Sequence, residues 1–167
     1  MEKVYEGNEI YFEHLDLKYL SEYLRWFNDP SIYKFIGNSY SEISETMERR
    51  YVLANQDKEM FSIIDKDTGN IVGIVGFNWF YTREIGMFIG TEYHGLGYGK
   101  KALALFIEYA FQVLGVNDLK AIVFSNNTKT LSLCKSFGFE ITKVVPYVVS
   151  MFDEYVDDVH LTLKKKV

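Results

Sequence analysis

Three glycines alternate with larger residues in the stretch YHGLGYGKKA, which runs from Tyr93 to Ala102. Glycine at every second position costs conformational entropy on folding, so the chain must need an unobstructed backbone here. The stretch EIGMFIG before it has the character of a strand, and residues of helical periodicity follow it. A turn that leads from a strand into a helix exposes free N–H groups at the positive end of the helix dipole. The sequence therefore predicts an anion site, most often a phosphate site, at residues 94–100.

The composition fits one self-contained domain, residues 1–167. A chain of this length buries enough surface to fold without a disulfide or a structural metal. Its net charge of −5 disfavours nucleic acid as a partner, and its single cysteine favours a reducing compartment. The N-terminus has no signal-peptide character, and the longest apolar run, residues 71–81, is shorter than the roughly 20 residues of a membrane span. We expect a cytoplasmic protein that acts on neither nucleic acids nor membranes.

Hydrophobic periodicity and turn residues divide the chain into strands and helices. The expected strands are residues 10–14, 58–66, 71–81, 84–90, 119–124, 140–149 and 156–164. The expected helices are residues 16–27, 41–55, the segment from the glycine turn to Leu114, and residues 126–137. This order predicts an α+β fold, a mixed and mostly antiparallel sheet of about seven strands flanked by four helices.

Three kinds of phosphate-containing ligand are candidates for the glycine turn. A nucleoside triphosphate loop needs glycine at position 94 and Ser or Thr at position 101, where this chain has His94 and Lys101. A dinucleotide fingerprint needs a third glycine at position 100, which is Lys100, and an acid after the next strand, which ends in Phe124-Ser125. The first ligand is therefore excluded and the second is disfavoured.

The third ligand is acetyl-CoA. Gly95, Gly97 and Gly99 resemble the Q/R-x-x-G-x-G/A loop of the GCN5-related N-acetyltransferases, the GNAT family. A second segment, Asn127 to Phe139, is similar to the N-x-x-(A/S)-x-x-L-Y-x-x-x-G-F pattern of that family. The resemblance covers nearly the whole chain and implies the GNAT fold. The softer patterns RWFNDP, EIGMFIG and FDEYVDDV are most similar to the branch with ribosomal-protein and spermidine acetyltransferases.

The resemblance implies which residues bind acetyl-CoA as co-substrate. The backbone of the strand would hold the pantetheine arm, and the turn would hold the pyrophosphate. Asn127 would bond the arm or, as the alternative, cap its helix, and Asn126 can serve as the cap instead. Gly86 is either a bulge that turns an N–H toward the thioester carbonyl or a point of close packing. His94 stands where the family usually has Gln or Arg, and this difference should weaken binding of the pyrophosphate. The cofactor set is Met87, Phe88, Ile89, His94, Gly95, Leu96, Gly97, Tyr98, Gly99, Lys100 and Asn127.

The resemblance also implies acetyl transfer to an amine, which needs a base for the amine proton. Glu84 is the candidate base, and its alternative is a strand residue paired with a cation such as Arg83. Cys134 stands where the family often has a tyrosine that protonates the leaving thiolate. Because it follows Asn127 by two helical turns, it points to the same site. We interpret Cys134 as a pocket-wall residue, with proton donation as its alternative role.

The acceptor is the least constrained part of the hypothesis. We favour a small-molecule amine, either a polyamine or an amino sugar, over a peptide N-terminus, and the acids Glu42, Glu45 and Glu48 weakly favour a polyamine. A non-catalytic CoA-binding module is the alternative of another class, and a homodimer is left open. The three histidines lack metal-ligand spacing, so we expect no metal. The aromatic residues available as acceptor-pocket walls or as core are Trp26, Tyr33, Trp79, Phe80 and Tyr81.

Overall fold

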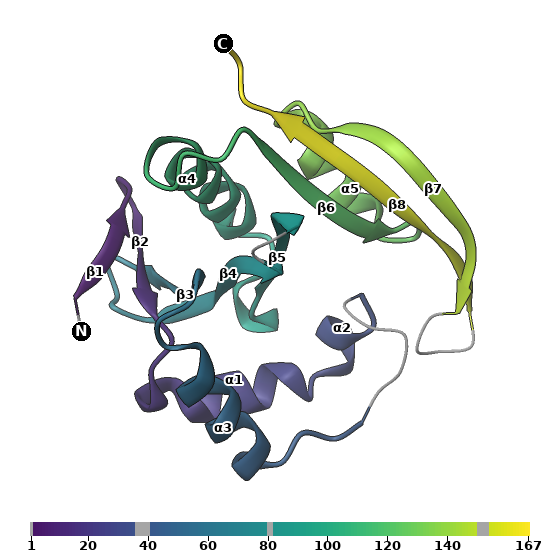
Figure 1. The fold of residues 1–167 in the computed structure, drawn as a ribbon. Helices are drawn as coiled ribbons and strands as arrows, with labels where there is room; N and C mark the ends of the chain where they lie inside the picture. Colours follow the sequence, from purple (N-terminus) through teal and green to yellow (C-terminus); the bar gives the residue numbers. More distant parts are fainter. Residues whose placement is uncertain (1, 36–40, 80–81, 150–153) are drawn as a thin grey trace.

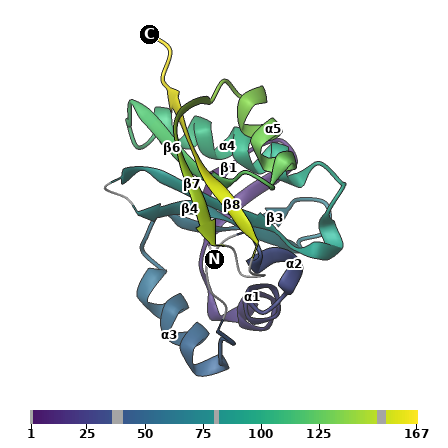
Figure 2. The same ribbon diagram turned by 90° about the vertical axis from the view of Figure 1, so that its right-hand side faces the viewer.

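The computed structural model describes residues 2–35, 41–79, 82–149 and 154–167, which form one sheet with helices on both faces (Figures 1 and 2). The strand order across the sheet is β1-β2-β3-β4-β5-β6-β8-β7. Neighbouring strands are antiparallel except β5 and β6, which are parallel. The expected mixed, mostly antiparallel fold is therefore confirmed. The strands are β1 (Lys3–Glu6), β2 (Ile10–His14), β3 (Met60–Asp65), β4 (Ile71–Trp79), β5 (Glu84–Ile89), β6 (Asp118–Phe124), β7 (Glu140–Val149) and β8 (Tyr155–Lys164).

The helices divide between the two faces of the sheet, with α1 to α3 on one side and α4 on the other (Figure 2). Side chains of α4 and α5 share one apolar cluster, in which Phe106 and Tyr109 pack against Phe61. Side chains of α1, α2 and α3 share the second cluster, where Tyr23 and Trp26 are fully buried. The helices are α1 (Leu20–Phe27), α2 (Pro30–Tyr33), α3 (Glu45–Asn55), α4 (Tyr98–Gln112) and α5 (Thr128–Ser136).

The described residues contain one more strand and one more helix than the sequence predicted. The additional strand is β1, which pairs with β2 at the edge of the sheet. The additional helix is α2, which begins at the proline that was expected only to stop α1. Proline is well suited to the first turn of a helix, and the Asp29 carboxylate caps this one by accepting a hydrogen bond from the Ser31 N–H at 2.9 Å.

The feature that positions the site is the separation of β5 from β6. The two strands pair in register only at Glu84 and Lys120, next to the hydrogen bond that the Lys120 N–H donates to the Arg83 carbonyl at 3.0 Å. Beyond that point they diverge, so the middle of the sheet opens into a gap (Figure 1). The backbone of β5 along this gap lacks a neighbouring strand among the described residues.

Candidate functional site

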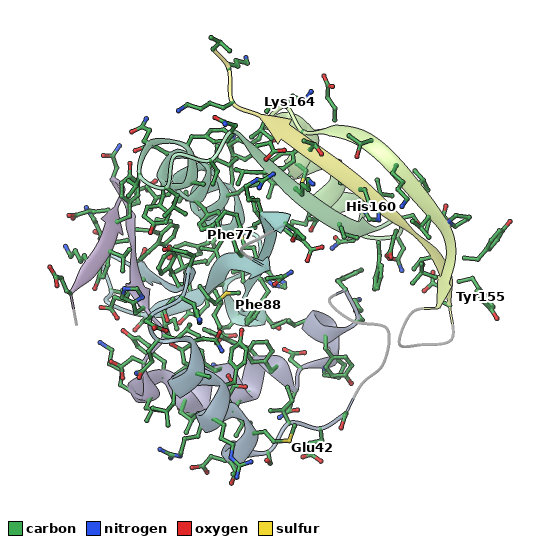
Figure 3. The ribbon with its side chains drawn as sticks, in the orientation of Figure 1. Glu42, Phe77, Phe88, Tyr155, His160 and Lys164 are labelled. Atoms are coloured by element: carbon green, nitrogen blue, oxygen red, sulfur yellow. The ribbon has the colours of Figure 1, made fainter. Side chains whose placement is uncertain are left out.

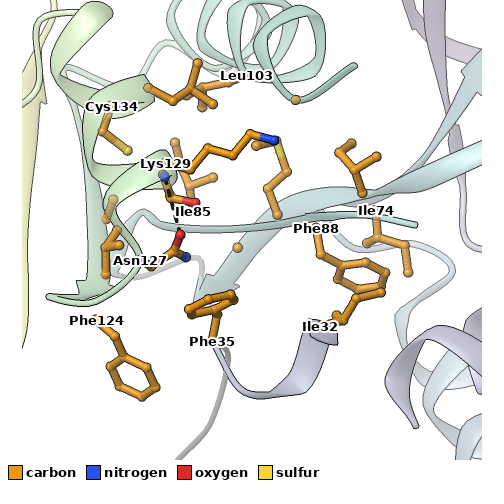
Figure 4. Close-up of a pocket in the computed structure, with 18 of the residues that line it drawn as sticks. Ile32, Phe35, Ile74, Ile85, Phe88, Leu103, Phe124, Asn127, Lys129 and Cys134 are labelled. Carbon is orange, nitrogen blue, oxygen red and sulfur yellow. Dashed lines mark hydrogen bonds between the residues drawn. The ribbon is translucent and has the colours of Figure 1, made fainter. Parts of the chain in front are cut away.

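A cavity of about 1330 Å³ occupies the gap between β5 and β6. Its walls come from β5 and β6, from the N-terminal ends of α4 and α5, and from α2 (Figure 4). Of the thirteen sequence-predicted site residues, the cavity brings together every one except Leu96. Leu96 is 60% exposed on the outer side of the glycine turn.

The glycine turn forms as the sequence predicted, because two of its glycines adopt conformations that other residues avoid. Gly95 has a φ of 77° and Gly97 a φ of 86°, and a Cβ at either position would point into open space. Gly97 is the N-cap of α4, so the first N–H groups of the helix lack partners within the helix. Lys100 adds a positive charge to this end of the cavity. The turn therefore presents the free backbone donors that an anion site requires.

The side chains of Tyr98 and His94 hold the turn in place rather than filling it. The Tyr98 hydroxyl donates a hydrogen bond to Asp65 at the end of β3, at 3.0 Å. His94 Nε2 lies 2.7 Å from the Ile89 carbonyl, which fixes the start of the turn to the end of β5. Because the carbonyl accepts, this ring nitrogen carries the proton. Either residue can reach an anion mainly through its backbone.

Along β5, the backbone groups of successive residues point alternately toward β4 and toward the gap. The Arg83 carbonyl faces β6 and the Gly90 N–H faces β4, so backbone groups of Met87 and Ile89 face the gap, whereas those of Phe88 face β4. Phe88 lies between the sheet and α1 (Figure 3). Its ring lines the cavity and packs against Phe27 of α1 at 5.2 Å between centroids. Two of the three expected backbone contacts are thus available to a ligand in the gap, and the third residue contributes a side chain.

Of the two alternatives for Gly86, a bulge or close packing, the bulge is not at this position: the register shift lies on the neighbouring strand β4. Gly86 pairs regularly with Gly76, and the register shifts between Phe77 and Trp79, so Asn78 is the extra residue. A Cβ on Gly86 would lie 2.1 Å from Asn78 Oδ1. Close packing by Asn78 is therefore the reason for glycine at position 86, so of the two alternatives that the sequence left open the structure supports close packing and not a bulge.

Asn78 is a site residue that the sequence did not reveal. Its Nδ2 donates a hydrogen bond to Glu84 Oε2 at 3.2 Å, on the wall of the cavity. Arg83 is not the partner of Glu84, because its guanidinium binds Asp118 on β6 at 2.5 Å. Within the described residues, Glu84 makes no ion pair. The candidate base is thus a half-buried carboxylate oriented by an amide and not neutralised by a cation.

Asn127, which immediately precedes α5, and Cys134 within α5 both line the cavity, as their spacing predicted (Figure 4). Asn127, and not Asn126, caps the helix, since its Oδ1 accepts a hydrogen bond from the Thr130 N–H at 3.3 Å. Its Nδ2 has no protein partner among the described residues and can donate into the cavity. Cys134 is 4% exposed, and burial raises the pKa of its thiol from 9.0 to about 11. Such a thiol stays protonated at neutral pH and is a poor nucleophile.

The part of the cavity next to α1, α2 and α3, called the acceptor side below, has different aromatic walls from those expected. Trp26 is fully buried in the core and donates its indole N–H to Glu92 at 3.2 Å, and Tyr33 does not line the cavity. The Trp79 side chain, Phe80 and Tyr81 lie outside the described residues. Glu42, Glu45 and Glu48 are also absent from the wall, and Glu48 is buried. The apolar residues that do form this side are Phe27, Ile32, Phe35, Tyr51, Met60, Ile74 and Phe88.

Two further findings concern metal binding and membrane spanning in the described part of the chain. Nowhere in it do three or more His, Cys, Asp or Glu side chains gather in a way that could hold a metal ion. None of its helices combines the length and the apolar character needed to cross a membrane.

The comparison with known families identifies this arrangement. A family model for the acetyltransferase (GNAT) domain matches residues 9–140. The chain belongs to the GNAT acetyltransferase family. As a GNAT protein it is an N-acetyltransferase that uses acetyl-CoA, in agreement with the glycine turn and the segment from Asn127 to Phe139.

Individual relatives of this GNAT protein differ in their named activities. It is 28% identical over 156 residues to the acetyltransferase PseH of Campylobacter jejuni, covering 92% of this chain and 91% of the relative. It is 28% identical over 119 residues to the spermidine N(1)-acetyltransferase of Escherichia coli, covering 70% of this chain and 59% of the relative. The crystal structure of spermidine N-acetyltransferase from Vibrio cholerae with CoA and spermine matches with a TM-score of 0.82 at 19% identity, over 95% of this chain and 96% of the other.

Proposed function

We propose that this GNAT enzyme acetylates a primary amine of a small molecule by direct attack on acetyl-CoA, with a polyamine or an amino sugar as acceptor. The observation that carries the proposal is the continuous cavity from the glycine turn, where backbone N–H groups converge, to the carboxylate of Glu84. A site for an anionic cofactor and a candidate base for the amine thus lie in one cavity.

The residues present fit acetyl-CoA. The N–H groups at the start of α4 and the Lys100 side chain are suited to the pyrophosphate, and the positive φ of Gly95 and Gly97 leaves space for it. The free edge of β5 can hydrogen-bond an extended arm as an added strand would, through Met87 and Ile89. Asn127 Nδ2 is placed to donate to the same arm. Bound acetyl-CoA supplies an activated thioester.

Glu84 would take the proton that the attacking amine must lose, directly or through a water. The hydrogen bond from Asn78 orients its carboxylate. Glu84 lies at the end of the gap where β5 and β6 still pair, which is called its closed end. Cys134 would act as a wall residue. Proton transfer from a thiol with a pKa of about 11 to an ordinary thiolate is unfavourable, because that thiolate has a conjugate acid with a pKa near 8.5.

The walls of the acceptor side support a small acceptor with an apolar part and a positive charge. They combine aromatic and aliphatic side chains with carboxylates, which suits an alkylamine. The names of two relatives agree with an alkylamine acceptor, since one acts on spermidine and one is bound to spermine in its crystal structure. A peptide N-terminus is the second acceptor class to be tested.

The proposal is tested by following release of the CoA thiol from acetyl-CoA with a panel of polyamines, amino sugars and N-terminal peptides. We expect release with a small amine, and we expect Glu84→Gln to lower kcat by about 10² to 10⁴-fold while binding of acetyl-CoA is unchanged. Measurable acetyl-CoA binding without release for any amine would favour a non-catalytic CoA-binding module. A Glu84→Gln enzyme with the wild-type rate at every pH would remove Glu84 as the base.

A further inference from the structure

Asp158 on β8 is a second carboxylate in the wall of the cavity, and its Oδ1 has no partner among the described residues. Its Oδ1 is shielded from solvent, and within the described residues no hydrogen bond or ion pair reaches the side chain. The residues paired with it in the sheet, Phe124 on β6 and Val145 on β7, are apolar. Asp158 is half-buried as a whole, so the shielded Oδ1 is the oxygen that lacks both solvent and a protein partner, and a ligand in the cavity can supply that partner.

Asp158 and Glu84 lie on the same face of the sheet. Glu84 is in register with Lys120 of β6, and Asp158 is in register with Phe124 of the same strand. Because side chains alternate along a strand, Lys120 and Phe124, four residues apart, share a face, and their paired neighbours share it with them. Phe88 follows Glu84 by four residues and therefore lies on the same face, where its ring packs against Phe27 of α1. Both carboxylates therefore belong to the acceptor side.

The two carboxylates mark separate positions along the cavity. Four residues of β6 span about 13 Å, and β5 and β8 lie on opposite sides of that strand. An amine held near Glu84 is thus distant from Asp158. A single ammonium group at the reacting position leaves Asp158 without a partner.

The protein's own cations do not compensate Asp158. Lys100 and Lys129 line the cavity at the starts of α4 and α5, and Lys34, which follows α2, lies over the Phe35 ring at 4.7 Å. His160 follows Asp158 on the same face of β8 and is in register with Ile122 and Lys143. Among the described residues none of these cations is within ion-pair distance of Asp158.

We infer that Asp158 binds a cationic group of the acceptor other than the amine that receives the acetyl group. The site then selects diamines over monoamines of the same length, and the apolar side chains of the acceptor side contact the alkyl chain between the two nitrogens. The inference rests on the proposed function, because it takes the Glu84 end of the cavity as the place of the reacting amine. Asp158 is a specificity-determining residue in this scheme.

The test measures binding and turnover separately. Protein saturated with CoA is titrated calorimetrically with straight-chain α,ω-diamines of graded length and with monoamines of equal length, and the same amines are assayed for thiol release. The variant is Asp158→Asn, and the matched control is Asp157→Asn, whose carboxylate accepts a hydrogen bond from the Tyr147 N–H at 3.2 Å on the adjoining strand. Thermal unfolding of each variant reports on structural damage.

We expect the wild-type protein to bind one length of diamine at least about tenfold more tightly than the matching monoamine. Asp158→Asn should remove this preference, leave monoamine binding within about twofold, and not lower the melting temperature, whereas Asp157→Asn should keep the preference. Equal binding of diamines and monoamines by the wild-type protein, or a preference that survives Asp158→Asn, overturns the inference. Diamine binding that depends on Asp158 without thiol release keeps the inference and refutes the proposed catalysis.

Discussion

Glu48 provides a prediction about stability that follows from its burial. The side chain lies on α3, the residue is 3% exposed, and Oε1 has no hydrogen-bond partner in the described part of the chain. Burial raises the pKa of its carboxyl from 4.5 to about 7. Replacing Glu48 by Gln keeps the shape and removes the ionisation, so the variant isolates the effect of this one charge.

The sign and the size follow from proton binding. The unfolded chain releases the Glu48 proton near pH 4.5 and the folded chain near pH 7, so between these values the folded state binds more protons. The free energy of unfolding therefore falls as the pH rises through this window. The difference between the two pKa values corresponds to about 3 kcal/mol above pH 7, and to less than about 1 kcal/mol at pH 5.

We expect Glu48→Gln to be more stable than the wild type by about 3 kcal/mol at pH 8 and by less than about 1 kcal/mol at pH 5. Urea unfolding followed by the fluorescence of the buried Trp26 measures both values. Glu45→Gln is the control, because Glu45 is exposed on the same helix and pairs with Arg49 at 3.0 Å. A difference between wild type and Glu48→Gln that is constant from pH 5 to pH 8 would refute the reasoning.

Three further outcomes follow from the geometry of the site. Gly97→Ala should lose about 1–2 kcal/mol of stability and bind acetyl-CoA more weakly in a thermal-shift assay, because its φ is 86°. Gly99→Ala, whose Cβ would meet its nearest neighbours at 3.9 Å, should keep its stability, and equal losses in both variants would contradict this. Gly86→Ala should lose about 1–3 kcal/mol through its clash with Asn78, and adding Asn78→Gly should recover most of that loss in urea unfolding. Cys134→Ala should keep turnover within a few-fold by thiol release, whereas a drop of about 100-fold would assign proton donation to the thiol.

The glycine turn and the α5 segment could be predicted from the sequence because their signals are local. Gly95 and Gly97 are required by the backbone conformation of the turn itself, and Asn127 and Cys134 share a helix face by spacing alone. The sequence left open which residue caps α5, since Asn126 and Asn127 are equally good caps by type. Only the structure shows that the helix begins at Thr128.

Asn78 and Asp158 could not be predicted, because their positions depend on pairing between strands. Asn78 lies in a mostly apolar run that predicted a regular strand, and it becomes the extra residue only through the register of β4 with β5. Asp157 and Asp158 are adjacent acids in the same tail segment, and a shift of one residue would exchange their faces. The register of β8 with β6 decides that Asp158 lines the cavity, while Asp157 bonds to the backbone of Tyr147.

The separation of β5 from β6 explains why these features occur together. A fully paired sheet would satisfy the backbone of Met87 and Ile89 internally and would leave no cavity. The gap leaves those backbone groups for a ligand, and hydrogen bonds to an extended arm would complete the sheet in place of a strand. It also places Glu84 at its closed end and Asp158 beyond β6, on one face of the sheet. In the proposed scheme, one interruption in the sheet thus provides an unpaired backbone edge for the cofactor and a cavity whose wall contains both carboxylates.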